Sequence, residues 1–111
     1  MAVRTKLLTS GRATGPVVAT IYTCPDGETA ILKWLTVFNV NLSTTTDVLL
    51  TMDVAGVNLT SYHRFVLVAG KGDMLGLYQV LHPGMEVAIQ VVAAVGVNYW
   101  LSGAELEGTA D

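Results

Sequence analysis

The stretch that decides the fold is Ile21–Asn41, IYTCPDGETAILKWLTVFNVN. Two β-prone runs flank the turn sequence Cys24–Gly27, in which proline presets φ at the second position and glycine accepts a positive φ at the last. In the strand Thr29–Asn41 that follows, alternation places Ile31, Leu35 and Val37 on one face and Ala30, Leu32, Trp34, Phe38 and Val40 on the other. A strand that is apolar on both faces is covered on both, by a second sheet, a loop or another subunit.

Further β-prone runs lie on either side of this stretch, and turn signals separate them. They are Val17–Tyr22, Asp47–Val54, Val57–Tyr62, Arg64–Ala69, Leu75–Leu81, Met85–Ala93 and Asn98–Glu107. Asp47–Val54 alternates apolar and polar residues with the period of a half-buried strand, and His82-Pro83-Gly84 has the residue order of a type II turn. No window shows a helical period. About eight strands at this spacing predict an all-β fold, an antiparallel β-sandwich of jelly-roll type over residues 16–107.

The two ends of the chain are predicted to lie outside the sandwich. Arg4, Lys6 and Arg12 supply half of the six basic residues, with no acidic residue among them, and Gly11 and Gly15 favour a bent linker. Residues 1–15 are therefore expected to form a flexible basic arm. Residues 108–111 are expected to form a disordered tail.

The composition indicates surplus apolar surface. The chain has 111 residues, 51% of them hydrophobic and 14% charged, whereas about 25% of residues are charged in an average soluble protein. Such a small, weakly charged domain favours an oligomer or a docked subunit, although a monomer rich in alanine and valine is the alternative. The net charge is −3, and every acidic residue lies from Asp26 onward. A basic arm on an acidic body suits contact with a neighbouring subunit and disfavours nucleic acid as a partner.

The sequence contains no signal for secretion or for a membrane. The N-terminus has charges but no apolar segment after them, and the longest apolar run, Val91–Val97, is far shorter than the ~20 residues of a membrane span. The single cysteine, Cys24, rules out an intramolecular disulfide. We expect a soluble protein that folds in a reducing compartment.

No catalytic, cofactor or metal motif is recognisable, so neither an enzyme nor a bound cofactor or metal is expected. Cys24 lies in a turn without a nearby base, and we interpret it as an inert turn residue. His63 and His82 lack sequence-local metal ligands, and Asp47 and Asp53 are ~20 Å apart along one strand face, too far for a glycosidase pair. A different possibility is a sugar-stacking platform on a sheet face, formed by Tyr62, Tyr78, Tyr99 and Trp100.

Two segments of the chain resemble a known group of proteins. Ile21–Lys33, IYTCPDGETAILK, resembles the phrase L-Y-T-V-P-x-G-x-T-A-x-V-K that opens small all-β virion proteins of tailed bacteriophages. Asn98–Leu106, NYWLSGAEL, resembles their glycine-containing final strand, and Cys24, where valine is usual, is a departure that leaves the turn intact. The resemblance implies a structural part of the phage particle, commonly a trimeric sandwich.

The leading hypothesis is a capsid decoration (cement) protein, a homotrimer that also contacts the major capsid protein or another virion protein. The expected location is the virion, after assembly in the host cytoplasm. The residues expected at its assembly interfaces are Arg4, Lys6 and Arg12 in the arm and Trp34, Phe38 and Trp100 in the sandwich. Two alternatives remain open, a tail fibre or baseplate module that binds host surface glycan and a tail or connector component.

Overall fold

The computed structural model describes residues 6–54 and 57–107, with side chains for residues 6–52 and 63–106. Its eight strands are β1 (Lys6–Thr14), β2 (Val17–Thr23), β3 (Glu28–Asn39), β4 (Thr46–Val54), β5 (Val57–Leu67), β6 (Gly72–Leu81), β7 (Met85–Val91) and β8 (Gly96–Glu107). The described residues contain no helix. The all-β prediction is confirmed.

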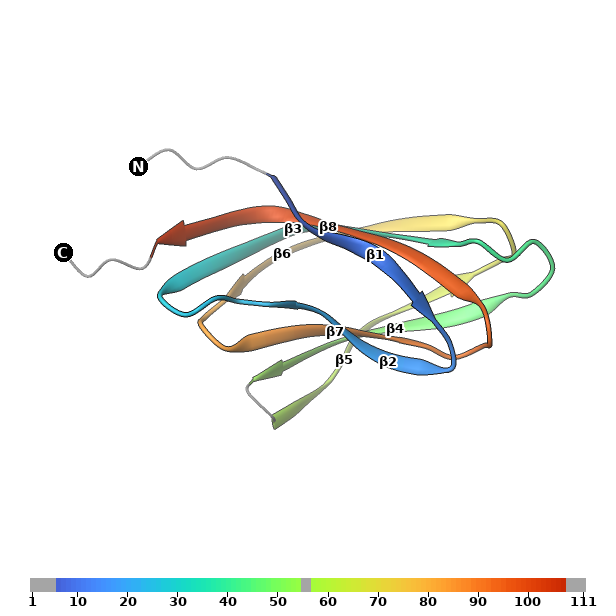
Figure 1. The fold of residues 1–111 in the computed structure, drawn as a ribbon, viewed down its shortest axis with the longest axis horizontal. Helices are drawn as coiled ribbons and strands as arrows, with labels where there is room; N and C mark the ends of the chain where they lie inside the picture. Colours follow the sequence, from blue (N-terminus) through green and yellow to red (C-terminus); the bar gives the residue numbers. More distant parts are fainter. Residues whose placement is uncertain (1–5, 55–56, 108–111) are drawn as a thin grey trace.

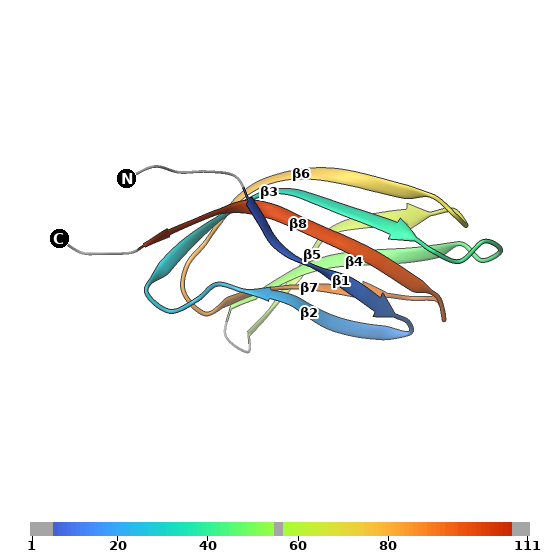
Figure 2. The same ribbon diagram turned by 45° about the horizontal axis from the view of Figure 1, so that its top comes forward.

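The strands form two four-stranded antiparallel sheets that pack face to face (Figure 1). The first, sheet A, has the order β1-β8-β3-β6, and the second, sheet B, has the order β2-β7-β4-β5. The pairs β1·β8, β2·β7, β3·β6 and β4·β5 are nested, so the chain crosses between the two layers repeatedly before and after the β4–β5 hairpin (Figure 2). This nesting of antiparallel pairs is the jelly-roll topology that the strand count predicts.

The predicted number of strands is right, but two of the assignments differ. The two short strands predicted at Val57–Tyr62 and Arg64–Ala69 are one continuous strand, β5, which accommodates register shifts opposite Leu50–Asp53. The remaining strand is β1, in the segment predicted to be an arm. A bulge admits an extra residue without ending a strand, which is why local pattern alone split β5 in two.

The prediction of a flexible arm is wrong for Lys6–Thr14. This segment pairs with β8 from Lys6↔Gly103 to Thr14↔Gly96 and forms an edge of sheet A. Gly11, taken as a linker residue, lies against a ring, where an added Cβ would be 2.7 Å from the Tyr99 hydroxyl oxygen. The glycine is therefore suited to close approach rather than to flexibility. Arg4 and the predicted tail at 108–111 lie outside the described residues.

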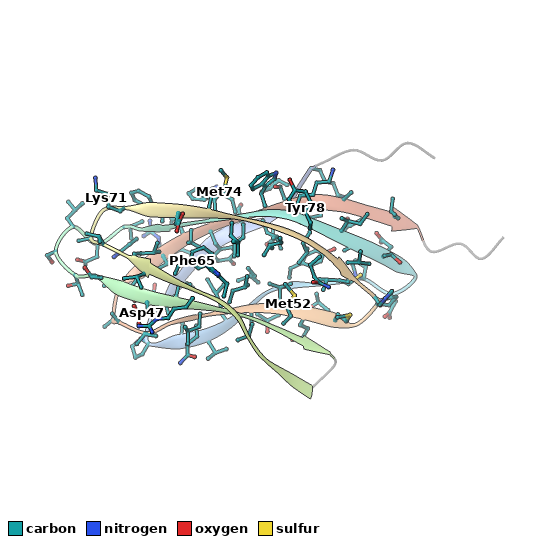
Figure 3. All side chains as sticks on the ribbon, turned by 180° about the vertical axis from the view of Figure 1, so that it is seen from behind. Asp47, Met52, Phe65, Lys71, Met74 and Tyr78 are labelled. Atoms are coloured by element: carbon teal, nitrogen blue, oxygen red, sulfur yellow. The ribbon has the colours of Figure 1, made fainter. Side chains whose placement is uncertain are left out.

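The core lies between the two sheets and follows the alternation that the sequence shows. On β4 the side chains of Val48, Leu50 and Met52 are buried, and on β7 those of Val87, Ile89 and Val91 are buried. Phe65 of β5 completes this layer, and Figure 3 shows Phe65 and Met52 between the sheets. These inward faces were predicted correctly from period-two patterning.

The predicted faces of β3 are wrong, because a bulge interrupts the alternation. In the pairing with β8, β3 advances two residues from Leu32 to Trp34 while β8 advances one, so one extra residue, Lys33, enters β3. Ala30 and Leu32 face the core before the bulge, and Leu35 and Val37 face it afterwards. Trp34 and Phe38 are consequently on the outer face of sheet A.

Two turns connect the strands near one end of the sandwich. His82–Met85 is the type II turn that the sequence predicts, with the Met85 amide donating to the His82 carbonyl at 3.1 Å and Gly84 at φ 85°. In the turn before β3, the Glu28 amide donates to the Pro25 carbonyl at 3.2 Å and Gly27 has φ 77°. Proline therefore occupies the first turn position, one place earlier than predicted.

Candidate assembly surface

The outer face of sheet A carries several large apolar side chains, with Ser102 and Thr36 between some of them. Strand register aligns them in rows: Leu7 of β1 and Trp34 of β3 flank Ser102, and Trp100 of β8 and Met74 of β6 flank Thr36. The exposed members are Leu7, Trp34, Phe38, Met74, Tyr78, Val80 and Trp100, and we call this set the apolar face. Each strand of the sheet contributes to it, so it spans the full width of the layer.

The rings of this face lie close to the sheet because glycine faces them on β6. Trp34 is opposite Gly76, where an added Cβ would be 3.2 Å from the Trp34 ring and 3.1 Å from the Tyr78 ring. The Trp34 and Tyr78 rings meet edge to face with centroids 5.8 Å apart. Phe38 has the same arrangement opposite Gly72. A side chain at Gly76 would displace these rings. Glycine therefore allows the Trp34 and Tyr78 rings to lie against the backbone of β6.

The apolar face is large for a chain of this size. Exposed fractions range from 37% for Phe38 to 66% for Tyr78. Together the seven side chains leave on the order of 700 Å² in water, somewhat above the ~300–600 Å² of the largest apolar patch on a typical monomer. Figure 3 shows Met74 and Tyr78 along β6, on the side of sheet A away from the core. Such a surface is typical of a contact site for another macromolecule.

The outer face of sheet B is different in character. It carries an ion pair between Arg64 and Asp47 and a hydrogen bond from the Thr20 hydroxyl to Glu86 at 3.3 Å. Its exposed valines, Val18 and Val66, are on the two edge strands, β2 and β5. The surplus apolar surface implied by the composition is therefore concentrated on sheet A.

The predicted interface residues fall into two groups. Trp34, Phe38 and Trp100 come together on the apolar face. Lys6 and Arg12 are instead on edge strand β1, where Arg12 donates to Asn98 of β8 at 2.8 Å. Arg12 is in register with Asn98 and Phe38 and borders the apolar face, whereas Lys6 is apart from it and pairs with Glu105.

Lys6 belongs to a polar cluster that joins three strands at the end of the sandwich. Its ammonium lies 2.7 Å from one Glu105 oxygen, and the Tyr22 hydroxyl donates to the other at 2.6 Å. These two hydrogen bonds, that of Lys6 above all, hold the pKa of Glu105 below its usual value. Burial, reinforced by the Glu105 carboxylate, raises the pKa of Tyr22. The cluster, which we call the β1 clasp, ties β1 and β8 of sheet A to β2 of sheet B.

The remaining candidates for chemistry are isolated from one another. Cys24 is buried, with its sulfur 3.6 Å from the Leu81 carbonyl, and burial raises the pKa of its thiol. Among the described residues no group of three or more histidine, cysteine, aspartate or glutamate side chains is placed to hold a metal ion. His63 packs edge to face on Phe65, with centroids 4.7 Å apart. No helix in the described part of the chain has the length and apolar character needed to cross a membrane.

Sequence reasoning missed four members of the apolar face: Leu7, Met74, Tyr78 as an assembly residue, and Val80. Tyr78 was considered only for sugar stacking, and it is exposed as that role needs. Trp100 is exposed as well, whereas Tyr99 packs against the core and the side chain of Tyr62 lies outside the described set. One signal in the sequence could have indicated the members on β6. Apolar residues follow one another along this strand, so alternation places some of them on each face of the sheet.

Comparison with solved structures shows where this fold recurs. A chain of the disulfide-linked pili formed by Bacillus endospore appendages has a TM-score of 0.58 at 14% identity, covering 96% of this chain and 89% of that one. A chain of the cyanophage Pam1 capsid has a TM-score of 0.52 at 17% identity, covering 92% of this chain and 85% of that one. The VP2 subviral particle of infectious bursal disease virus gives 0.52 at 14% identity, covering 96% of this chain and 33% of that one.

At these identities the likeness shows the fold alone. No protein-family model and no curated protein sequence matches the chain.

Proposed function

We propose that this chain is a structural protein of a tailed-phage virion, a capsid decoration protein that assembles as a homotrimer and reinforces the shell. The single observation that carries the proposal is the apolar face of sheet A, whose exposed area is above that of the largest apolar patch on a typical monomer. The fold neighbours include viral capsid and pilus chains, which is consistent with a structural role.

Burial of the apolar face supplies the free energy of assembly in this proposal. Each ~100 Å² of apolar surface removed from water contributes roughly 2.5 kcal/mol before the entropy costs of association. Trp34, Phe38 and Trp100 contact neighbouring subunits, and the effect is repeated over many copies on the shell. A decoration protein reinforces a capsid by this kind of distributed contact rather than by a reaction.

The basic residues near the N-terminus attach the protein to the capsid in the same proposal. Arg12 is exposed on edge strand β1, and Arg4 precedes that strand. A cationic edge on a chain with net charge −3 is suited to an acidic surface on the major capsid protein. Because Lys6 is engaged with Glu105, Arg4 and Arg12 are expected to contribute more than Lys6 does.

Co-sedimentation with capsids that lack this protein tests the proposal. The purified chain is expected to bind them, and the double substitution Arg4→Gln with Arg12→Gln is expected to weaken attachment while leaving the fold intact. Arg64→Gln with Lys71→Gln removes the same charge elsewhere and is the matched control. Wild-type protein that stays in the supernatant at micromolar concentrations would overturn the proposal.

A second candidate is recognition of host surface glycan by a tail fibre or baseplate module. The observation that favours it is the pairing of exposed rings with polar neighbours: Trp100 and Tyr78 are on the apolar face, and Asn98 with Arg12 borders Trp100. Binding on a glycan array that is lost with Trp100→Ala would support it. An array without signal would leave the decoration role as the better supported.

A further inference from the structure

The backbone of Tyr78 is unusual. Tyr78 has φ 49°, in the left-handed region that residues with side chains rarely adopt, and it is the one described non-glycine residue with positive φ. It lies where β6 carries an extra residue relative to β3, between the pairs Trp34↔Gly76 and Leu32↔Gln79. A bulge in this conformation re-aims a side chain, and here the ring points away from the core.

The chain itself gains little from holding the ring in this position. Tyr78 is the most exposed aromatic residue described, and its ring contact within the chain is the edge-to-face one with Trp34. A glycine would adopt the same backbone conformation without the steric strain. An unfavourable conformation that exposes a large ring is typical of a residue whose favourable contacts are made with a partner.

We propose that the apolar face of sheet A seats a second copy of this chain, with Tyr78 as the preformed anchor of that contact. This inference rests on the proposed function and specifies the surface and residue by which its subunits meet. The exposed apolar surface, on the order of 700 Å², is close to the ~800 Å² that each partner buries in a standard stable interface. Tyrosine in a fixed outward position beside other aromatics is also typical of an interface hot spot.

A second copy is the favoured occupant because apolar surface needs an apolar partner, and the apolar face of another copy provides one. Packing the apolar face on the outer face of sheet B would bury the Arg64–Asp47 ion pair and the polar Gln90 between two subunits. We therefore infer that the apolar faces of the copies meet one another. In a trimer they meet around the three-fold axis, each face contacting the other two.

Substitution of Tyr78 by glycine separates an anchor from a structural residue. In Tyr78→Gly the strain is relieved, so the midpoint of unfolding of the dissociated chain is expected to be unchanged or raised, while self-association weakens roughly 30-fold or more. In Tyr78→Ala the strain remains and the ring is lost, so self-association weakens as in Tyr78→Gly, while the midpoint of unfolding of the dissociated chain is expected to stay near that of wild type. Val66→Ala, on the outer face of sheet B, is the control and is expected to change neither.

Analytical ultracentrifugation over a concentration series measures self-association, and thermal unfolding of dilute protein measures stability. Wild-type protein that stays monomeric at 100 µM, or Tyr78→Gly protein that associates as tightly as wild type, would overturn the inference. Tyr78→Gly protein that unfolds at a clearly lower temperature would assign the ring to intramolecular packing and overturn it as well. Capsid co-sedimentation tests the virion role separately. If the chain associates through Tyr78 but does not bind capsids, the proposed function is overturned and the inference about self-association stands.

Discussion

Replacing Tyr22 with phenylalanine is expected to destabilise the sandwich and to do so in a pH-dependent way. The substitution removes only the hydroxyl that donates to Glu105 at 2.6 Å. A hydrogen bond to a charged acceptor contributes about 1.5–3 kcal/mol, and the 18% exposure of the Glu105 side chain lets water recover part of it. We expect a loss of about 1–2 kcal/mol at pH 7, or a midpoint roughly 4–8 °C lower.

The pH dependence follows from the lowered pKa of Glu105. A carboxyl whose pKa is lower in the folded chain than its ordinary 4.5 adds stability that is complete above that value. This stability is lost as the pH falls through the lowered, folded-state pKa. The difference between wild type and Tyr22→Phe should therefore be largest at neutral pH and should shrink below pH 4.5.

Urea denaturation at a series of pH values between 2.5 and 7 is the appropriate assay. Tyr99→Phe is the matched control, because the Tyr99 hydroxyl makes no hydrogen bond with a described residue. If Tyr22→Phe and wild type have the same free energy of unfolding at pH 7, the β1 clasp does not stabilise the fold. A difference that persists unchanged at pH 2.5 would refute the assignment of the effect to the Glu105 carboxylate.

Three further predictions concern the core, the buried thiol and the apolar face. Leu101→Ala, at a fully buried site of β8, should cost about 2–5 kcal/mol in urea denaturation; a loss under 1 kcal/mol would contradict the core assignment. The Cys24 thiol should react slowly with a thiol reagent at pH 8 in the native chain and rapidly in urea, since it is buried and its pKa is raised; fast native labelling would refute this. Gly76→Ala should shift the Trp34 ring and change the near-UV circular dichroism while the far-UV spectrum is retained, and an unaltered near-UV spectrum would show that the ring does not rest there.

The sandwich itself could be predicted because most of its strands obey simple rules. On β4 and β7 large apolar residues recur at every second position, and the structure buries Val48, Leu50, Met52, Val87, Ile89 and Val91. Turn residues mark the boundaries where the backbone needs them, as at His82–Met85. In these segments the local sequence pattern agrees with the burial in the folded chain, so the pattern predicts which side chains are buried.

The faces of β3 could not be predicted, because one residue changes them. Nothing in the alternation around Lys33 shows that the strand bulges there, since both faces of Thr29–Asn41 are apolar. A shift of one residue exchanges the inner and outer sets completely. Trp34 and Phe38 are exposed, although the alternation placed them on one face with Ala30 and Leu32, which the core contains.

β1 escaped prediction for a different reason. Of its nine residues only Ala13 is fully buried, so the segment carries almost no hydrophobic pattern. Its position depends on the open edge of β8 and on the β1 clasp, which joins residues far apart in the sequence. Backbone pairing of this kind is set by the partner strand and leaves little trace in local composition.

The bulges also explain how a small chain directs its surplus of apolar residues to one surface. The register shifts of β1, β3 and β6 occur at the same level of sheet A, beside Ser102 of β8. Beyond this level the shift in β3 turns Trp34 outward, and the extra residue in β6 turns Tyr78 outward next to it. Without the β3 shift, strict alternation would have directed Trp34 and Phe38 into the core and turned Leu35 and Val37 outward. The insertions that disturb the sheet are thus what places the aromatic rings where another copy can contact them.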